Sequence, residues 1–90
     1  MRKSPGRIDY SKKFLKQLKK APLSIKIAFR QKSELFINDP FNFLLNNHAL
    51  SGKLKGSRSI NITGDWRAIF TENKDVIIFE LLGTHSQLYK

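Results

Sequence analysis

Two histidines, His48 and His85, are the side chains of this sequence that change charge near neutral pH. The chain contains no cysteine, which excludes disulfides, thiolate metal sites, iron–sulfur clusters and thiol nucleophiles. His48 follows two asparagines and His85 follows a Gly-Thr pair, so both are expected in loops or at strand ends. A lone histidine in such a place is most often only solvated, so its surroundings decide whether it does chemistry.

The sequence between the two histidines supplies charged and aromatic side chains near predicted strand ends. The set consists of Lys53, Lys55, Arg58, Asp65, Trp66 and Arg67. If a sheet brings those ends together, two imidazoles lie beside a carboxylate and several cations. Metal-free RNA cleavage needs such a set, because a base must take the proton of the ribose 2′-OH and an acid must protonate the leaving 5′-oxygen. Cations then stabilise the extra charge on the attacked phosphate.

Aromatic side chains add a means of holding RNA. Trp66 or Tyr89 can stack on an unpaired base, although for Trp66 a place in the core is favoured. The candidate RNA-binding residues are therefore Lys53, Lys55, Arg58, Trp66, Arg67 and Tyr89. Neither a metal nor another cofactor is expected, because the histidines lack metal-ligand spacing and the sequence has no phosphate-binding glycine loop or nucleophile elbow.

The charge of the chain is strongly basic and unevenly distributed. Its 90 residues, enough for one domain (residues 1–90), carry a formal net charge of +10. Residues 1–58 hold fourteen basic and three acidic residues, whereas residues 59–90 hold three basic and four acidic ones. This division indicates a face that binds a polyanion, and simple solubility is the alternative. Without an apolar stretch long enough for a membrane span or a secretory signal, the expected setting is the cytoplasm.

Hydrophobic periodicity predicts the elements that must position these residues. Residues 7–10 alternate like an edge strand, and Ser11 is a favourable N-cap for a helix that ends before Pro22. The apolar face of this helix consists of Phe14, Leu15 and Leu18. Because that face is narrow, docking on a sheet is favoured over binding to a membrane surface.

A second helix is expected from Ser24, as its N-cap, to about Asn38. Its apolar face consists of Ile25, Ala28, Phe29, Leu35 and Phe36, with Lys32 among them and its ammonium group reaching solvent. Residues 41–50 are expected to form a turn or short helix that covers one end of the core, and residues 51–57 a loop.

From Arg58 onward the hydrophobic period becomes two, which indicates strands. The expected segments are strands at residues 58–63, 66–71 and 76–82, a hairpin turn at residues 72–75 and a tail at residues 86–90. The third of these strands is apolar on its inner face and is expected at the centre of the sheet. The order β-α-α-β-β-β predicts an α+β fold with two helices packed on a mostly antiparallel sheet, in two layers.

Four short motifs in a fixed order resemble a known family. They are His48-x-Leu-x-Gly, Leu54-Lys-Gly-x-Arg, Asp65-Trp-Arg and Gly83-Thr-His-Ser-x-Leu-Tyr. Over residues 8–89 the sequence resembles the YafQ branch of the RelE-like toxins, ribosome-dependent mRNA interferases of bacterial type II toxin–antitoxin systems. The resemblance implies a RelE-like fold and endoribonuclease activity.

The resemblance also implies roles for individual residues. His48 and Asp65 correspond to a catalytic histidine and a catalytic aspartate, and His85 corresponds to the proton donor. Tyr89 corresponds to an aromatic residue near the substrate. The base would be His48, or Asp65 acting through His48. Phosphate would be held by Lys55, Arg58 and Arg67.

Two positions depart from the resemblance. Asn61 stands where the branch carries another histidine, and Leu81 stands where it carries an active-site arginine. Loss of that arginine removes a phosphate ligand, which Lys55, Arg58 or Arg67 would replace, or else cleavage is slower or has a different codon preference.

The implied partners are a cognate antitoxin, acidic and partly disordered, and mRNA on the ribosome. Operator DNA would be contacted only through the antitoxin, and no membrane is involved. Two alternatives remain open. One is a toxin of the same fold that is not a nuclease, such as a ParE-like topoisomerase inhibitor, and the other is a basic RNA-binding module whose histidines are incidental.

Overall fold

The computed structural model describes residues 5–89, which form an α+β fold. Its elements are β1 (Arg7–Tyr10), α1 (Lys12–Lys20), α2 (Leu23–Asn38), β2 (His48–Ala49), β3 (Arg58–Asn61), β4 (Trp66–Asn73), β5 (Val76–Thr84) and α3 (His85–Leu88), with 3-10 turns at Phe43–Leu45 and Gly52–Leu54.

The strands form one sheet in the order β1-β5-β4-β3-β2, in which β1 runs parallel to β5 and the other pairs are antiparallel. The predicted class and mostly antiparallel sheet are confirmed. Arg2, Lys3 and Lys90 of the predicted basic and tail segments lie outside the described residues.

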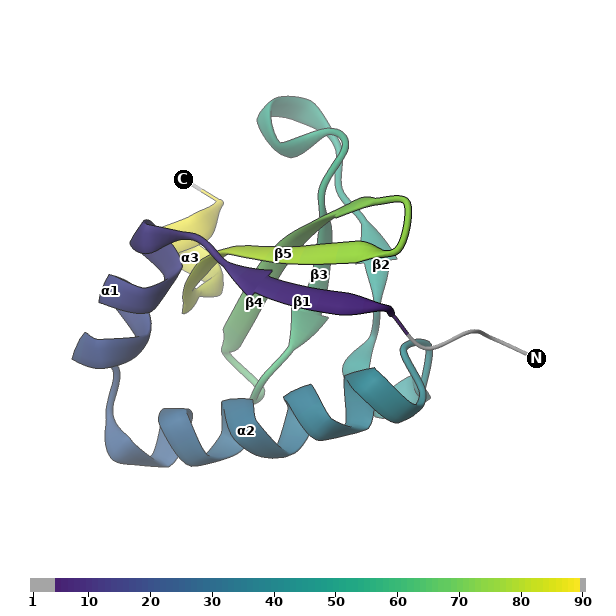
Figure 1. Ribbon diagram of the computed structural model, residues 1–90. Helices are drawn as coiled ribbons and strands as arrows, with labels where there is room; N and C mark the ends of the chain where they lie inside the picture. The colour runs from purple at the N-terminus through teal and green to yellow at the C-terminus, as the bar shows by residue number, and fades with distance from the viewer. Residues whose placement is uncertain (1–4, 90) are drawn as a thin grey trace.

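The core lies between the sheet and the helices α1 and α2, which extend along one side of the sheet (Figure 1). It is built around Phe79 of β5, which is fully buried. The Phe79 ring lies 5.4 to 5.9 Å, between centroids, from the rings of Tyr10, Phe14, Phe29, Phe36 and Phe70. Because these rings come from β1, α1, α2 and β4, one side chain joins both helices to the sheet.

Helix α1 begins as predicted at Ser11. The Ser11 hydroxyl accepts a hydrogen bond from the Phe14 N–H at 2.9 Å and donates one to the Glu80 carbonyl at 2.8 Å. Phe14 is fully buried and Leu18 is packed against the core, whereas Leu15 is 49% exposed. The prediction that Leu15 belongs to the buried face is wrong, because α1 faces the sheet with Phe14, Leu18 and Gln17, whose side-chain oxygen accepts a hydrogen bond from the Leu82 N–H at 2.8 Å.

Helix α2 begins one residue earlier than its predicted N-cap. Leu23 is its first residue, Pro22 precedes it, and Ser24 lies exposed inside the first turn. The prediction of Ser24 as N-cap is wrong, because Pro22 has a φ of −56° and its carbonyl already accepts from the Ile25 and Lys26 N–H groups. The end at Asn38 is confirmed.

The buried face of α2 contains a polar residue in addition to the predicted apolar ones. Ile25, Phe29 and Phe36 are buried as predicted, and so is Ser33. The Lys32 ammonium group does not reach solvent freely, since it donates a hydrogen bond to the Ile62 carbonyl at 3.2 Å. Lys32 therefore ties α2 to the chain that follows β3.

Replacing Ser11 by alanine is expected to lower the free energy of unfolding by about 1 kcal/mol, since the first turn of α1 loses its cap. The matched change of Ser24 to alanine removes a hydroxyl that caps nothing, so it is expected to alter stability by no more than about 0.5 kcal/mol. Urea denaturation of the two variants measures both changes. Equal losses would contradict the assignment of the caps.

Paired residues in neighbouring strands share a face, so the register sorts the side chains of the sheet onto two faces. The core face carries the paired row of Ile60, Ala68 and Leu82. The opposite face, called here the α3 face, carries the row of His48, Ser59, Ile69 and Leu81 and the row of Asn61, Arg67 and Gly83. One predicted site residue, His48, and one predicted phosphate ligand, Arg67, therefore share a face.

The end of the chain differs most from prediction. The predicted tail at residues 86–90 is the helix α3 up to Leu88, and β5 extends to Thr84. The strand predicted as central, β5, is flanked by β1 and β4, and β4 occupies the middle of the five strands. Among residues 5–89, no helix has the length and apolar character that crossing a membrane requires.

Candidate active site

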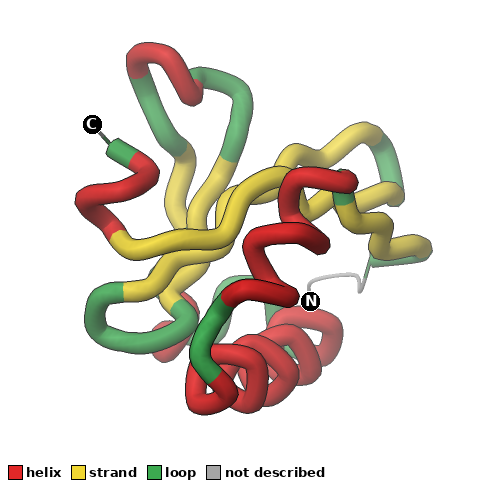
Figure 2. Tube along the Cα trace, turned by 90° about the vertical axis from the view of Figure 1, so that its left-hand side faces the viewer, coloured by secondary structure: helices red, strands yellow, loops and turns green. Residues whose placement is uncertain are grey.

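A hollow on the α3 face brings the two histidines together. It has a volume of about 360 Å³ and is lined by Asn46, His48, Leu50, Arg67, His85 and Tyr89. The lining residues come from β2 and its flanking turns, from β4 and from α3. In Figure 2, α3 and the loop between β2 and β3 project from the same end of the sheet. Four of the predicted site residues thus lie at one place, although their sequence positions are far apart.

His85 is the first residue of α3, and two interactions hold it. The Thr84 hydroxyl accepts from the Gln87 N–H at 3.2 Å, and the Gln87 side-chain oxygen accepts from the Thr84 N–H at 2.8 Å. This reciprocal capping box starts the helix. The His85 N–H also donates to the Asp65 carbonyl at 2.8 Å, so the bend between β3 and β4 holds the start of α3.

Gly83 allows α3 to fold back onto the sheet. A Cβ atom at this position would lie 3.1 Å from the Gln87 side-chain oxygen and 3.3 Å from a methyl carbon of Leu88. A side chain here would displace Gln87 or Leu88 by a few tenths of an ångström, so glycine suits the close approach of α3 to the end of β5. The Tyr89 ring follows one turn later, with its centroid 4.7 Å from that of His85.

His48 lies in the edge strand β2 and is exposed. Its Nδ1 is 2.8 Å from the carbonyl oxygen of Asn46. Since a carbonyl oxygen only accepts hydrogen bonds, Nδ1 must carry the proton, which leaves the lone pair of a neutral ring on Nε2. Asn46 has a φ of 47°, in the left-handed region that asparagine tolerates better than most residues. The turn before β2 therefore sets the tautomer of His48.

Arg67 contributes a guanidinium group to the lining of the hollow. One of its terminal nitrogens, Nη1, donates to the carbonyls of Thr63, Gly64 and Trp66 at 3.1 to 3.2 Å. These bonds hold the side chain against the turn between β3 and β4. A guanidinium held in this way beside two imidazoles is suited to bind a phosphate.

Three predicted site residues do not line the hollow. Asp65 is exposed in the bend after β3, where its backbone rather than its carboxylate contacts His85. Lys53 and Lys55 are exposed on the loop between β2 and β3. Their roles stay predictions.

Two predicted RNA-binding residues lie on the core face, opposite His48. Trp66 packs against the hydrophobic core, which is the place that the sequence favours for it. Arg58 pairs with Ala49 and Phe70, and its guanidinium lies over the Phe41 ring with Cζ 5.2 Å from the centroid. The expectation that Arg58 joins the histidines is wrong, because Arg58 has the same strand parity as the core residue Ile60. Trp66 likewise has the parity of the core residue Ala68.

A sequence pattern carries little information about the remaining lining residues. Asn46 and Leu50 line the hollow but were not predicted to do so. The Asn-Asn pair before His48 was the available signal, because asparagine favours turns with a positive φ. Among residues 5–89, no three His, Asp or Glu side chains are grouped as a metal site.

A model of the family described as “Bacterial toxin of type II toxin-antitoxin system, YafQ” matches residues 6–90. The chain belongs to this YafQ family. The mRNA interferase toxin YafQ of Escherichia coli strain K12 is 31% identical to it, over 91% of this chain and 94% of that protein. The sequence resemblance is confirmed.

Solved YafQ structures share the fold. The crystal structure of YafQ from Escherichia coli strain BL21(DE3) superposes with a TM-score of 0.76 at 28% identity, covering 92% of this chain and 97% of that chain. YafQ in the Escherichia coli DinJ–YafQ toxin–antitoxin complex superposes with a TM-score of 0.73 at 28% identity, covering 92% of this chain and 96% of that chain. The predicted RelE-like architecture is thereby confirmed.

The two positions that the resemblance singled out, Asn61 and Leu81, lie on the α3 face. Asn61 pairs with Arg67, and Leu81 pairs with Ile69. Within the described chain, the Asn61 side-chain oxygen and the hydroxyl of its neighbour Ser59 are buried without a hydrogen-bond partner. The α3 face therefore carries two buried polar atoms without a partner and, at position 81, an apolar side chain.

Proposed function

We propose that this YafQ-family chain is an endoribonuclease that cuts mRNA on the ribosome by acid–base catalysis without a metal ion. The observation that carries the proposal is the hollow on the α3 face, where His48, His85 and Arg67 meet. The name of the Escherichia coli relative, an mRNA interferase toxin, supports the same reaction.

In this mechanism Nε2 of His48 takes the proton of the ribose 2′-OH, since its Nδ1 is committed to the Asn46 carbonyl. The 2′-oxygen then bonds to phosphorus, and the bond from phosphorus to the 5′-oxygen breaks. Protonated His85 donates its proton to that 5′-oxygen as it leaves. The products are a 2′,3′-cyclic phosphate and a free 5′-hydroxyl group. Arg67 stabilises the negative charge of the pentacoordinate phosphorus.

RNA is held by groups around this centre. The Tyr89 ring beside His85 stacks on a base, and the exposed ammonium groups of Lys53 and Lys55 contact the backbone of the strand. Asp65 contributes by holding the first residue of α3. With leucine at position 81, Arg67 is the residue that replaces the missing phosphate ligand of the branch.

The proposed partner is a cognate antitoxin with an acidic, partly disordered segment. YafQ of Escherichia coli forms a complex with DinJ, and this chain carries a formal net charge of +10. All five lysines of α1 are exposed and offer a basic surface to an acidic segment or, in the free toxin, to ribosomal RNA. In the cytoplasm the complex would contact operator DNA only through the antitoxin.

Induction of the gene in a bacterium tests the proposal. We expect growth to stop while cellular mRNA is cut within translated regions and plasmid supercoiling stays unchanged. Intact mRNA with altered supercoiling would contradict the nuclease and favour topoisomerase inhibition. Salt-sensitive RNA binding without cleavage would instead indicate a plain binding module.

A further inference from the structure

We propose that Arg58, on the core face of the sheet, is a positioning residue for His48 on the α3 face and acts through Asn47. The effect on cleavage rests on the nuclease proposed above, whereas the effect on the His48 ring does not.

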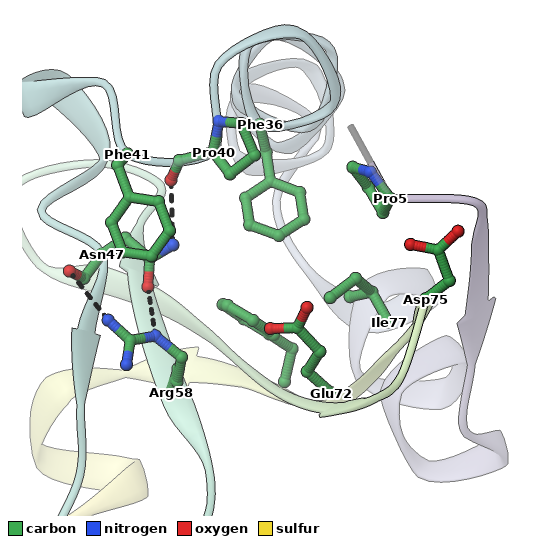
Figure 3. A pocket seen from close by; sticks show the side chains of 10 residues that line it. Pro5, Phe36, Pro40, Phe41, Asn47, Arg58, Glu72, Asp75 and Ile77 are labelled. Atoms are coloured by element: carbon green, nitrogen blue, oxygen red, sulfur yellow. Dashed lines mark hydrogen bonds between the residues drawn. The ribbon is translucent and has the colours of Figure 1, made fainter. Parts of the chain in front are cut away.

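Arg58 donates two hydrogen bonds to Asn47, the residue that precedes His48. Its Nε donates to the side-chain oxygen of Asn47 at 2.8 Å, and its Nη2 donates to the Asn47 backbone carbonyl at 3.4 Å. The Asn47 amide nitrogen in turn donates to the Pro40 carbonyl at 2.8 Å (Figure 3). A charge-assisted bond from a planar guanidinium is stronger and more directional than a neutral one, so it fixes Asn47 in place.

Strand β2 has little else to hold it. It consists of His48 and Ala49, both exposed, at the edge of the sheet. It pairs with β3 at only two positions, followed by one bond from the Leu50 N–H to the Ser57 carbonyl. An edge this short depends on the anchors at its ends, and Asn47 is the anchor at the beginning.

Alternation along the chain explains how Arg58 acts on a residue that it does not touch. Successive side chains of an extended chain point to opposite faces, so Asn47 reaches the guanidinium while His48 reaches the hollow with His85. The His48 ring bonds to the carbonyl of Asn46, on the other side of Asn47. Fixing Asn47 therefore fixes both the backbone of His48 and the carbonyl that orients its ring.

Packing alone does not immobilise the guanidinium. Arg58 borders a separate hollow of about 640 Å³, which Phe41 and Phe70 also line, with Glu72 near its far side (Figure 3). Within residues 5–89, the head group of Arg58 donates hydrogen bonds to Asn47 and lies over the Phe41 ring. The bonds to Asn47, rather than the shape of the surroundings, set its position.

The first test is the ¹⁵N NMR spectrum of the two imidazoles in the purified toxin. In the wild type, His48 should show a protonated Nδ1 bonded to a carbonyl. In the variant Arg58→Leu, its Nδ1 and Nε2 shifts should move toward those of a solvated histidine in tautomer exchange, while those of His85 stay in place. Arg30→Leu, which removes the same charge from the exposed side of α2, should move neither.

The second test is the cleavage of ribosome-bound mRNA. Arg58→Leu is expected to lower kcat on the order of 10- to 100-fold with little change in KM, since a misplaced base slows the reaction without releasing RNA. Asn47→Asp keeps an acceptor for Nε but loses the donor to the Pro40 carbonyl, so its His48 spectrum should lie between those of the wild type and Arg58→Leu. Arg58→Lys should not preserve the wild-type His48 spectrum, because a single ammonium cannot reproduce the planar pair of bonds. Both conservative variants keep the test valid if Arg58→Leu does not fold.

The outcomes separate the two proposals. An unchanged His48 spectrum in Arg58→Leu or Arg58→Lys overturns the positioning role, whatever happens to activity. A rise in KM at constant kcat also overturns it, because it would indicate a direct contact of Arg58 with RNA. If the His48 spectrum changes as expected but the wild type cuts no mRNA, the positioning role stands and the proposed nuclease fails.

Discussion

Replacing His85 by alanine is expected to slow mRNA cleavage by about 10²- to 10⁴-fold, because the departing 5′-oxygen loses its proton donor. The side chain is exposed at the start of α3, so its removal leaves the core unchanged. The capping box of Thr84 and Gln87 and the backbone bond to the Asp65 carbonyl do not involve the imidazole. The loss is therefore expected in chemistry rather than in folding.

Single-turnover rates on ribosome-bound mRNA measure the effect, and growth after induction provides a second reading. Ser86→Ala is the matched control, since Ser86 is the next exposed residue of α3 and does not line the hollow. It should retain the wild-type rate. If His85→Ala stops growth as efficiently as the wild type, His85 is not the acid and the mechanism fails.

Replacing Phe79 by alanine is expected to lower the free energy of unfolding by about 3–5 kcal/mol. The phenyl ring is completely buried among five other rings, and its loss leaves a cavity that elements from both layers line. A domain of this length has a total stability on the order of 5–13 kcal/mol. The variant should therefore lose a large part of its stability.

Urea denaturation with the same m-value for both proteins measures this loss. Phe43→Ala is the control, because Phe43 is 85% exposed and its removal should change stability by no more than about 0.5 kcal/mol. Similar losses in the two variants would show that Phe79 is not the centre of the core.

Much of the fold could be predicted from the sequence, because periodicity reports which side chains are buried. The alternation in β3, β4 and β5 and the caps at Ser11 and Asp39 locate most elements within two or three residues. Helix α3 was missed, since four residues hold too little periodicity to indicate a helix. The sequence signal for α3 was the capping box formed by Thr84 and Gln87. The prediction placed Gln87 in an irregular tail instead.

The sequence indicated both histidines of the candidate site, but it indicated only some of the cationic side chains that lie beside them. Residue type indicates that Arg58 and Arg67 can bind phosphate, yet the register decides which face each one occupies. Arg58 pairs with Phe70 toward the core, whereas Arg67 pairs with Asn61 and Gly83 on the α3 face. Position in the alternating pattern carries this information. The resemblance does not, because each of the two arginines belongs to one of its motifs.

The chemistry of the cut ends tests the central claim most directly. The purified wild-type toxin is incubated with mRNA on intact ribosomes, and the new ends are identified. The mechanism predicts a 2′,3′-cyclic phosphate on the upstream fragment and a 5′-hydroxyl on the downstream one, since attack by the 2′-oxygen gives no other first product. A 5′-phosphate with a 3′-hydroxyl, or intact mRNA, would contradict cleavage by the two histidines.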